Sequence, residues 1–417
     1  MIYQYLKRRK LDNHSNQNTK KLNTFTLSGL IIGPILGSGL ILLPPLLYNM
    51  VGNFTLVVWA IILVLGFVFA LIFGKLAILY PGDGGVSLAT KKAMGKKYQL
   101  LTSFYLICAV FFGPVAVLII AAQFIQPYFP DISLEVLGFF TYIITYVLLL
   151  TKIDFLGKIM LIVSSAITLI FLISSINIIL NINTFNFSIP LISLNDFGHA
   201  LIIVFWSIVG WEVIGNYSTE VKETKILTNS VKLSAIIISL VYILTTLAIC
   251  FGEFPKNEEF KLVWLIEPMF KEYSNLILAS VSIILCVGTL ILFVGGVSRL
   301  ISSLKITSYT SKHLKNNTPI GALNLLSMIY IITLVLVYFD ILSLENLVAF
   351  ADGFFIANAI IGLVTAIILF EKGFLKTSAI ILTFLFSVIL LFSNIIILAV
   401  IIGLFIFTYF KKSTSIK

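Results

Sequence analysis

Charged residues are scarce in this 417-residue chain, and their scarcity excludes a soluble fold. Asp, Glu, Lys and Arg together make up only 11% of the sequence, whereas hydrophobic residues make up 59%. The mean hydropathy is +1.09, and a soluble domain cannot hide so much apolar surface in a single core. The composition therefore predicts an all-α integral membrane protein.

Cysteine and histidine are also rare, which argues against metal and redox chemistry. The three cysteines lie apart in apolar stretches without metal or redox spacing, and the three histidines are widely separated in sequence. No zinc-protease, P-loop or nucleophile-elbow pattern occurs. We expect no metal, no cofactor and no enzymatic activity.

Long apolar runs are what the sequence has in abundance. Windows of about 20 apolar residues predict twelve transmembrane helices. The polar, basic N-terminal tail, residues 1–23, shows no cleavable signal pattern. The predicted spans are 24–48, 54–79, 98–126, 134–151, 155–180, 197–218, 226–251, 274–303, 320–339, 343–370, 375–391 and 394–411.

The basic residues are distributed unequally between the two sides of the predicted membrane. With a cytoplasmic N-terminus, all 28 Lys and Arg residues except Lys256, Lys261 and Lys271 fall on the cytoplasmic side. This bias is typical of a multi-pass protein of the cell membrane, here with both termini cytoplasmic. Topology and the lipid bilayer then explain the net charge of +10, and no nucleic-acid partner is expected.

The first span is interrupted at its middle by Gly37-Ser38-Gly39, between Gly33-Pro34 and Pro44-Pro45. Hydrocarbon offers no partner for a free backbone group, so a loosened helix at mid-depth is costly. Secondary transporters accept this cost, because unwound segments present N–H and C=O groups to a substrate. The interruption therefore predicts a binding site near the membrane midplane.

The spans divide into two blocks of five, residues 24–180 and 197–370, followed by a peripheral pair in 371–417. Because five is odd, the second block enters the membrane in the opposite orientation, as in an inverted repeat. Such a repeat requires a second interruption in the sixth span, where Gly210-Trp211-Glu212 lies at mid-depth. We expect helices 1 and 6 to be broken.

Apart from acids in the connections and at the very starts of spans, two of the 18 acidic residues, Glu212 and Asp352, remain within the membrane. A carboxylate there costs about 2.5–3.5 kcal/mol and usually marks an ion path, a proton relay or a ligand site. Glu212 could cap free N–H groups, anchor a helix, titrate with transport or contact the substrate. Asp352 could instead be a solvated helix start at the outer interface.

Three segments outside the membrane could take part in gating. The glycine-rich turn 80–86, followed by a short helix-like stretch, is either a simple loop or part of an inner gate. The connection 252–273 is either a solvated loop or an outer lid. Arg299, at the inner end of the eighth span, reads as a cytoplasmic anchor or gate residue.

The run from Gly37 to Pro44 resembles the Gly-Ser-Gly-Ile-Phe-x-x-Pro signature of the amino acid, polyamine and organocation (APC) superfamily. Other matches follow in the right order across spans 1 to 10: Tyr80-Pro81 with Gly84-Gly85, Gly210-Trp211-Glu212, and Ser298-Arg299. Within the superfamily, Gly113-Pro114 and the run from Ala351 to Ile356 look most like bacterial exporters of methionine and branched-chain amino acids.

The resemblance implies a LeuT-like fold of five plus five inverted helices that works by alternating access. The substrate carboxylate would bind N–H groups at a half-helix N-terminus. The ammonium would meet freed carbonyls, and an apolar side chain would project among aromatic residues. The implied residues are Leu36, Gly37, Ser38, Gly39 and Leu40 for the carboxylate, Phe205, Trp206 and Ile208 for the ammonium, and Phe112, Trp206, Trp211 and Phe293 for the side chain.

The fifth span departs from some proton-coupled relatives, which carry a lysine at its middle. This chain has Ser164, Ser165 and Thr168 there, so a sodium-like hydroxyl site is conceivable beside the favoured proton. Together with Glu212 and Asp352, the two serines are the candidate coupling or conformational residues.

The leading hypothesis is secondary active transport of neutral, hydrophobic amino acids, either ion-coupled or by exchange. The alternative is a carrier of cationic amino acids or polyamines that uses Glu212 as counter-ion. A remote alternative is a non-transporting membrane receptor.

Overall fold

The structure is a computed structural model that describes residues 22–182, 188–221, 223–255 and 258–410. In these ranges, every regular element is a helix apart from an isolated bridge between Leu22 and Val221. The α-helices are α2 (Thr24–Val51), α3 (Thr55–Leu79), α4 (Val86–Met94), α5 (Lys96–Ile125), α6 (Leu134–Leu149), α7 (Ile153–Leu180), α8 (Leu194–Phe205), α9 (Thr224–Phe251), α10 (Val263–Phe270), α11 (Ser274–Ser303), α12 (Ile320–Tyr338), α13 (Leu344–Leu369), α14 (Phe374–Leu391) and α15 (Ile395–Phe410).

Each predicted span coincides with one helix to within about three residues, except the sixth. Among the described residues, eight helical stretches are long and apolar enough to cross a membrane, the first of them running through α2 and α3. The helices α6, α8 and α15 are shorter but also apolar. The tails 1–21 and 411–417, which the sequence places in the cytoplasm, lie outside the described residues.

The sixth span differs most from its predicted form. The helix α8 ends at Phe205, residues 206–213 form turns, and the chain continues as the 3₁₀-helix η3 (Ile214–Glu220). Gly210 has a φ of 121°, a conformation open to glycine and costly for other residues. The second half of this span is therefore a tight 3₁₀ segment, where the sequence alone suggested an apolar membrane helix.

The connection 252–273 contains a helix that the sequence did not reveal. Within it, α10 buries Leu265 and Ile266, and α10 packs against α7 and α11. Proline and several glutamates gave this stretch the composition of a solvated loop. Tertiary burial of an apolar pair outweighs that local composition.

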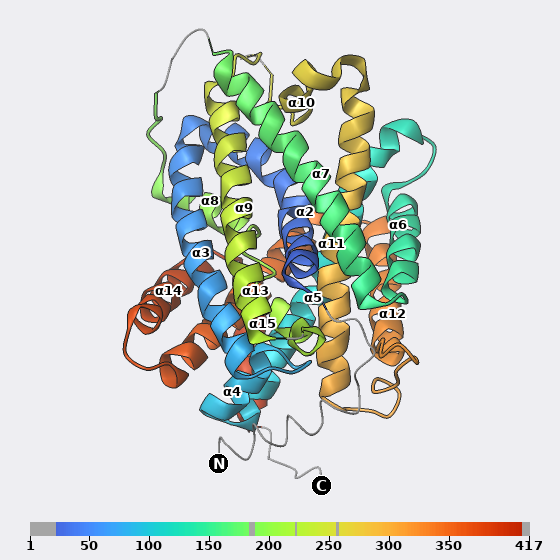
Figure 1. The fold of residues 1–417 in the computed structure, drawn as a ribbon, viewed down its shortest axis with the longest axis vertical. Helices are drawn as coiled ribbons and strands as arrows, with labels where there is room; N and C mark the ends of the chain where they lie inside the picture. The colour runs from blue at the N-terminus through green and yellow to red at the C-terminus, as the bar shows by residue number, and fades with distance from the viewer. Residues whose placement is uncertain (1–21, 183–187, 222, 256–257, 411–417) are drawn as a thin grey trace.

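The helix α2 lies at the centre of the bundle, packed between α7, α9 and α11 (Figure 1). Helix α5 lies between α11 and α13, while α14 packs on α13 and α3, and α15 packs on α13 and α5. Close approach depends on small residues: a Cβ built on Gly29 of α2 would lie 2.3 Å from the Leu161 Cα of α7. Figure 1 shows α10 at one end of the bundle and α4 at the other.

Candidate functional site

The helix α2 is interrupted at Gly37, whose φ of 29° and ψ of −137° are not helical. Pro34, one turn earlier, has no N–H group and already weakens the helix. The Thr289 hydroxyl on α11 donates to the Pro34 carbonyl oxygen at 2.9 Å. It fills the space beside Gly37, where a Cβ would lie 1.9 Å from the hydroxyl oxygen. A side chain of a neighbouring helix thus replaces a backbone partner at the interruption.

The second interruption, residues 206–213, follows α8 directly. The Phe205 and Trp206 carbonyls accept hydrogen bonds from the N–H groups three residues later, at 2.8 and 3.3 Å. The expectation that these carbonyls are free was wrong, because short 3₁₀-type bonds take them up. Glu212 Oε2 accepts from the Gly210 N–H at 3.1 Å, and only 2% of Glu212 is exposed.

A hydrogen bond joins the two interruptions. The indole Nε1 of Trp206 donates to the hydroxyl oxygen of Ser38 at 3.1 Å, and both residues are buried. The two breaks, which lie far apart in sequence, are therefore neighbours in space. This juxtaposition is what the inverted repeat requires of helices 1 and 6.

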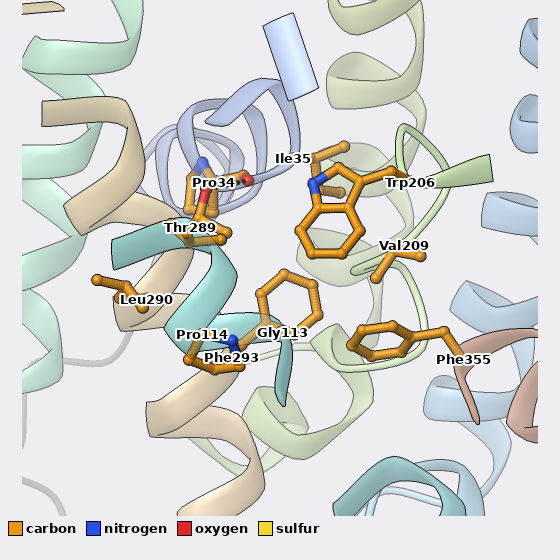
Figure 2. A pocket seen from close by; sticks show the side chains of 11 residues that line it. Pro34, Ile35, Gly113, Pro114, Trp206, Val209, Thr289, Leu290, Phe293 and Phe355 are labelled. Carbon is orange, nitrogen blue, oxygen red and sulfur yellow. Dashed lines mark hydrogen bonds between the residues drawn. The ribbon is translucent and has the colours of Figure 1, made fainter. Parts of the chain in front are cut away.

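A small cavity of about 20 Å³ lies beside this junction. Among the described residues that line it, only the Thr289 hydroxyl and the Trp206 indole N–H are polar side-chain groups. This space holds about one water molecule, so the helices around it must move apart before a substrate fits. The lining residues, most of them labelled in Figure 2, are Pro34, Ile35, Gly113, Pro114, Val117, Trp206, Val209, Thr289, Leu290, Phe293 and Phe355.

Two of the predicted aromatic residues, Trp206 and Phe293, line this cavity, and Phe293 packs edge-on against Phe355 at 5.4 Å. The others do not line it. Phe112 stacks on Phe350, and Phe205 packs against Phe386 of α14. Trp211, Ile208, Leu36 and Leu40 are buried in the surrounding helix contacts.

Sequence reasoning did not identify several lining residues as part of a site. Gly113 and Pro114 carried a signal, because a Gly-Pro pair at the middle of a span is unusual. Thr289 and Phe355 carried none, since they lie in apolar runs and only the packing of α11 and α13 against α2 and α5 brings them to the cavity.

The candidate coupling residues are dispersed. Asp352 is 1% exposed and lies well inside α13, whose N-cap is Ser343, so it is not a helix start. Within the described residues, Asp352 Oδ1 has no hydrogen-bond partner. Ser164 is buried next to Gly33 of α2, whereas the Ser165 side chain is exposed on the other face of α7.

A groove opens at the α10 end of the bundle, between α2, α5, α10 and α11. Its volume is about 780 Å³, and its lining includes Ile41, Phe124 and Phe260. Asn49, at the end of α2, holds the backbone of Phe260: its Oδ1 accepts from the Phe260 N–H at 2.7 Å, and its Nδ2 donates to the Phe260 carbonyl at 3.3 Å. The connection 252–273 is thereby fixed to the C-terminal half of α2.

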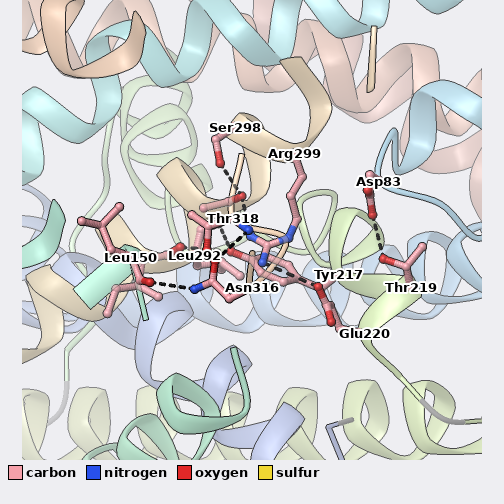
Figure 3. Close-up of polar contacts among 12 residues, drawn as sticks. Asp83, Leu150, Tyr217, Thr219, Glu220, Leu292, Ser298, Arg299, Asn316 and Thr318 are labelled. Atoms are coloured by element: carbon pink, nitrogen blue, oxygen red, sulfur yellow. Dashed lines mark hydrogen bonds and ion pairs between the residues drawn. The ribbon is translucent and has the colours of Figure 1, made fainter. Parts of the chain in front are cut away.

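A layer of polar contacts surrounds η3 at the α4 end of the bundle (Figure 3). Arg299 of α11 lies over the Tyr217 ring at 4.7 Å and pairs with Glu220 at 3.7 Å. The Thr219 hydroxyl donates to Asp83 in the glycine-rich turn at 2.7 Å. The Tyr217 hydroxyl binds carbonyls of α11, each at 3.0 Å. These contacts link the turn 80–86, η3 and the end of α11.

Residues 22–414 match the family described as amino acid permease. The chain is 24% identical over 355 residues to the L-methionine/branched-chain amino acid exporter YjeH of Escherichia coli (strain K12), covering 79% of this chain and 81% of the exporter.

Solved structures of the Eremococcus coleocola manganese transporter are also similar to this chain. A mutant and a complex with an aromatic bis-isothiourea substituted compound each give a TM-score of 0.61 at 14% identity. Each match covers 93% of this chain and 94% of the transporter. At this identity the likeness concerns the fold, which is LeuT-like.

Proposed function

Because the chain belongs to the amino acid permease family, we propose that it transports neutral, hydrophobic amino acids across the cell membrane by alternating access. The observation that carries this proposal is the cavity beside the two helix interruptions. Its lining is apolar and aromatic apart from one hydroxyl and one indole N–H. Such a lining favours an aliphatic or thioether side chain over a charged one.

The similar E. coli exporter supports the same substrate class. That protein is an exporter of L-methionine and branched-chain amino acids, substrates whose side chains suit an apolar cavity. The alternative cationic substrate would need a free carboxylate in the cavity. Glu212 is not among the lining residues, and one of its oxygens is engaged by the Gly210 N–H.

We propose that the groove at the α10 end is the outer access path and that the η3 layer is the inner gate. The groove lies between the outer half of α2 and α10, whereas polar contacts close the opposite end. In alternating access, the groove would close when the contacts around η3 open, so that the cavity faces one side at a time.

A proton is the coupling ion we propose, with Glu212 and Asp352 as the candidate carriers. Both carboxyl groups are buried inside the bundle, where acids mark ion paths or relays. The alternative sodium site loses one of its expected ligands, because the Ser165 side chain is exposed.

Uptake into proteoliposomes tests the function. Labelled L-leucine and L-methionine should accumulate, with arginine and putrescine failing to compete, and a proton gradient rather than sodium should drive the accumulation. Competition by arginine or putrescine at the affinity of leucine would reject the substrate class. Loss of accumulation on removing sodium at a constant pH gradient would reject the proton.

A further inference from the structure

Four lysines are concentrated where α4 turns into α5, at the end of the bundle that the distribution of Lys and Arg assigns to the cytoplasm. We call them the lysine cluster: Lys91 and Lys92 in the last turn of α4, and Lys96 and Lys97 in the first turn of α5. All four are exposed. The turn between the two pairs is open, because a Cβ built on Gly95 would meet no other described part of the chain within 4 Å. A ligand can therefore approach both pairs.

The packing of α4 fixes the direction of these side chains. The opposite face of α4 is buried, and α4 packs against α5 and α13. In this contact the hydroxyls of Thr90 and Thr365 form a buried hydrogen bond of 3.0 Å. Because the other face is held by burial and by this bond, the lysine cluster is a permanent part of the protein surface.

The lysine cluster lacks a negative counterpart. Among the described residues, none of its four members forms an ion pair. The acids nearby in the η3 layer are already engaged, since Asp83 accepts from the Thr219 hydroxyl and Glu220 pairs with Arg299. Four like charges within residues 91–97 repel one another, so an anion that neutralises them binds favourably.

One member of the cluster lies against the end of an apolar, outward-facing helix. The Lys97 ammonium donates to the Tyr409 carbonyl of α15 at 2.7 Å and lies 5.2 Å from the centre of the Tyr409 ring. Tyr409 and Phe410 are exposed, as are Phe405 and Ile406 one turn earlier. Aromatic residues at the end of an apolar span mark the membrane interface. The lysine cluster therefore lies at the level of the lipid headgroups.

We propose that the lysine cluster binds the phosphate headgroup of an anionic phospholipid in the inner leaflet. The phosphate meets the ammonium groups of both lysine pairs, and the acyl chains lie along the exposed apolar face of α15. Charged and apolar surfaces adjoin here, so the matching ligand carries a negative charge and a long apolar part, which a free phosphate lacks. The inference does not depend on the transported substrate.

The test measures lipid binding to the purified full-length protein by native mass spectrometry. Dioleoyl phosphatidylglycerol is compared with dioleoyl phosphatidylcholine, which has the same acyl chains and no net charge. The cluster variant carries Lys91→Gln, Lys92→Gln, Lys96→Gln and Lys97→Gln. A control variant removes the same charge from exposed lysines elsewhere on the inner side, through Lys225→Gln, Lys232→Gln, Lys312→Gln and Lys315→Gln.

The wild type should bind phosphatidylglycerol about tenfold more tightly than phosphatidylcholine, and the cluster variant should lose about tenfold in phosphatidylglycerol affinity. The control variant should stay within about twofold of the wild type, and so should a variant with arginine at the four cluster positions, because arginine keeps the charge. Thermal unfolding confirms that each variant is folded.

Three results would overturn the inference. The first is equal affinity of the wild type for the two lipids, which requires no variant. The second is an equal loss in the cluster and control variants, which would show that only the total charge matters. The third is displacement of phosphatidylglycerol by an equal concentration of inorganic phosphate, which would mean that the acyl chains contribute nothing.

Discussion

Gly37→Ala should destabilise the protein, in part through a steric clash with Thr289 that a second substitution can remove. The added Cβ would lie 1.9 Å from the Thr289 hydroxyl oxygen, and the φ of 29° disfavours any residue with a Cβ. We assign about 1–2 kcal/mol to the backbone strain, about 1–3 kcal/mol to overpacking and about 1 kcal/mol to the displaced Thr289 hydrogen bond. Gly37→Ala should therefore lose about 3–6 kcal/mol of stability.

The double variant separates these terms. Thr289→Ala alone removes the bond to the Pro34 carbonyl and should cost about 1–2 kcal/mol. Combined with Gly37→Ala, it also removes the overlapping hydroxyl, so the pair should cost about 2–4 kcal/mol. The two substitutions should thus be non-additive by about 2–4 kcal/mol, well above the roughly 0.3–0.5 kcal/mol expected for independent sites.

Thermal unfolding in detergent, followed with a thiol-reactive dye, measures this cycle. Cys250 and Cys286 are buried and should react only on unfolding. Additive destabilisation in the double variant would refute the proposed contact between α2 and α11. A Gly37→Ala protein as stable as the wild type would refute the backbone conformation itself.

Three further outcomes follow from single contacts. Glu212→Gln keeps an acceptor for the Gly210 N–H, so the unfolding temperature should stay the same. The pH dependence of leucine uptake should become flatter. An unchanged pH profile would exclude Glu212 from coupling. Tyr217→Phe removes a hydrogen bond that stabilises the polar contacts around η3 by about 1 kcal/mol. A cysteine placed at Val117 in a cysteine-free background should then react about fivefold faster with a maleimide added from the inner side. An equal rate would argue against the proposed inner gate. Asn49→Ala should raise amide exchange at Phe260 about tenfold in mass spectrometry, since it removes the acceptor of that amide; retained protection would mean that the connection 252–273 is held by other contacts.

The helices could be predicted from the sequence because the bilayer thickness and the need to pair backbone groups act on each segment separately. Backbone satisfaction and span length dictate apolar runs of fixed size, and most predicted spans match helices closely. The interruption at Gly37 was also readable, since glycine and proline at mid-span weaken a helix through the backbone alone. The helix α10 escaped notice because two buried residues in a polar stretch leave almost no periodic signal.

The candidate site was harder to predict, because side-chain direction depends on how helices rotate against each other. Phe112 and Phe293 have similar sequence surroundings, yet Phe112 stacks on Phe350 and only Phe293 lines the cavity. Thr289 is one hydroxyl in an apolar run, and its bond to Pro34 exists only because α11 crosses α2 at the interruption. Local sequence contains no information on such crossings.

The η3 layer has a consequence for leakage. Four consecutive residues of η3 bind three other parts of the chain: Tyr217 binds α11, Ser218 accepts from the Gly82 N–H, Thr219 binds Asp83, and Glu220 accepts from the Leu22 N–H. Displacing this short rigid segment breaks these bonds together, at a total of roughly 2–4 kcal/mol. A change of that size leaves the displaced form at a few per cent of molecules or less. An unloaded carrier would then seldom expose its inner end, and an ion gradient would not drain through it unaccompanied.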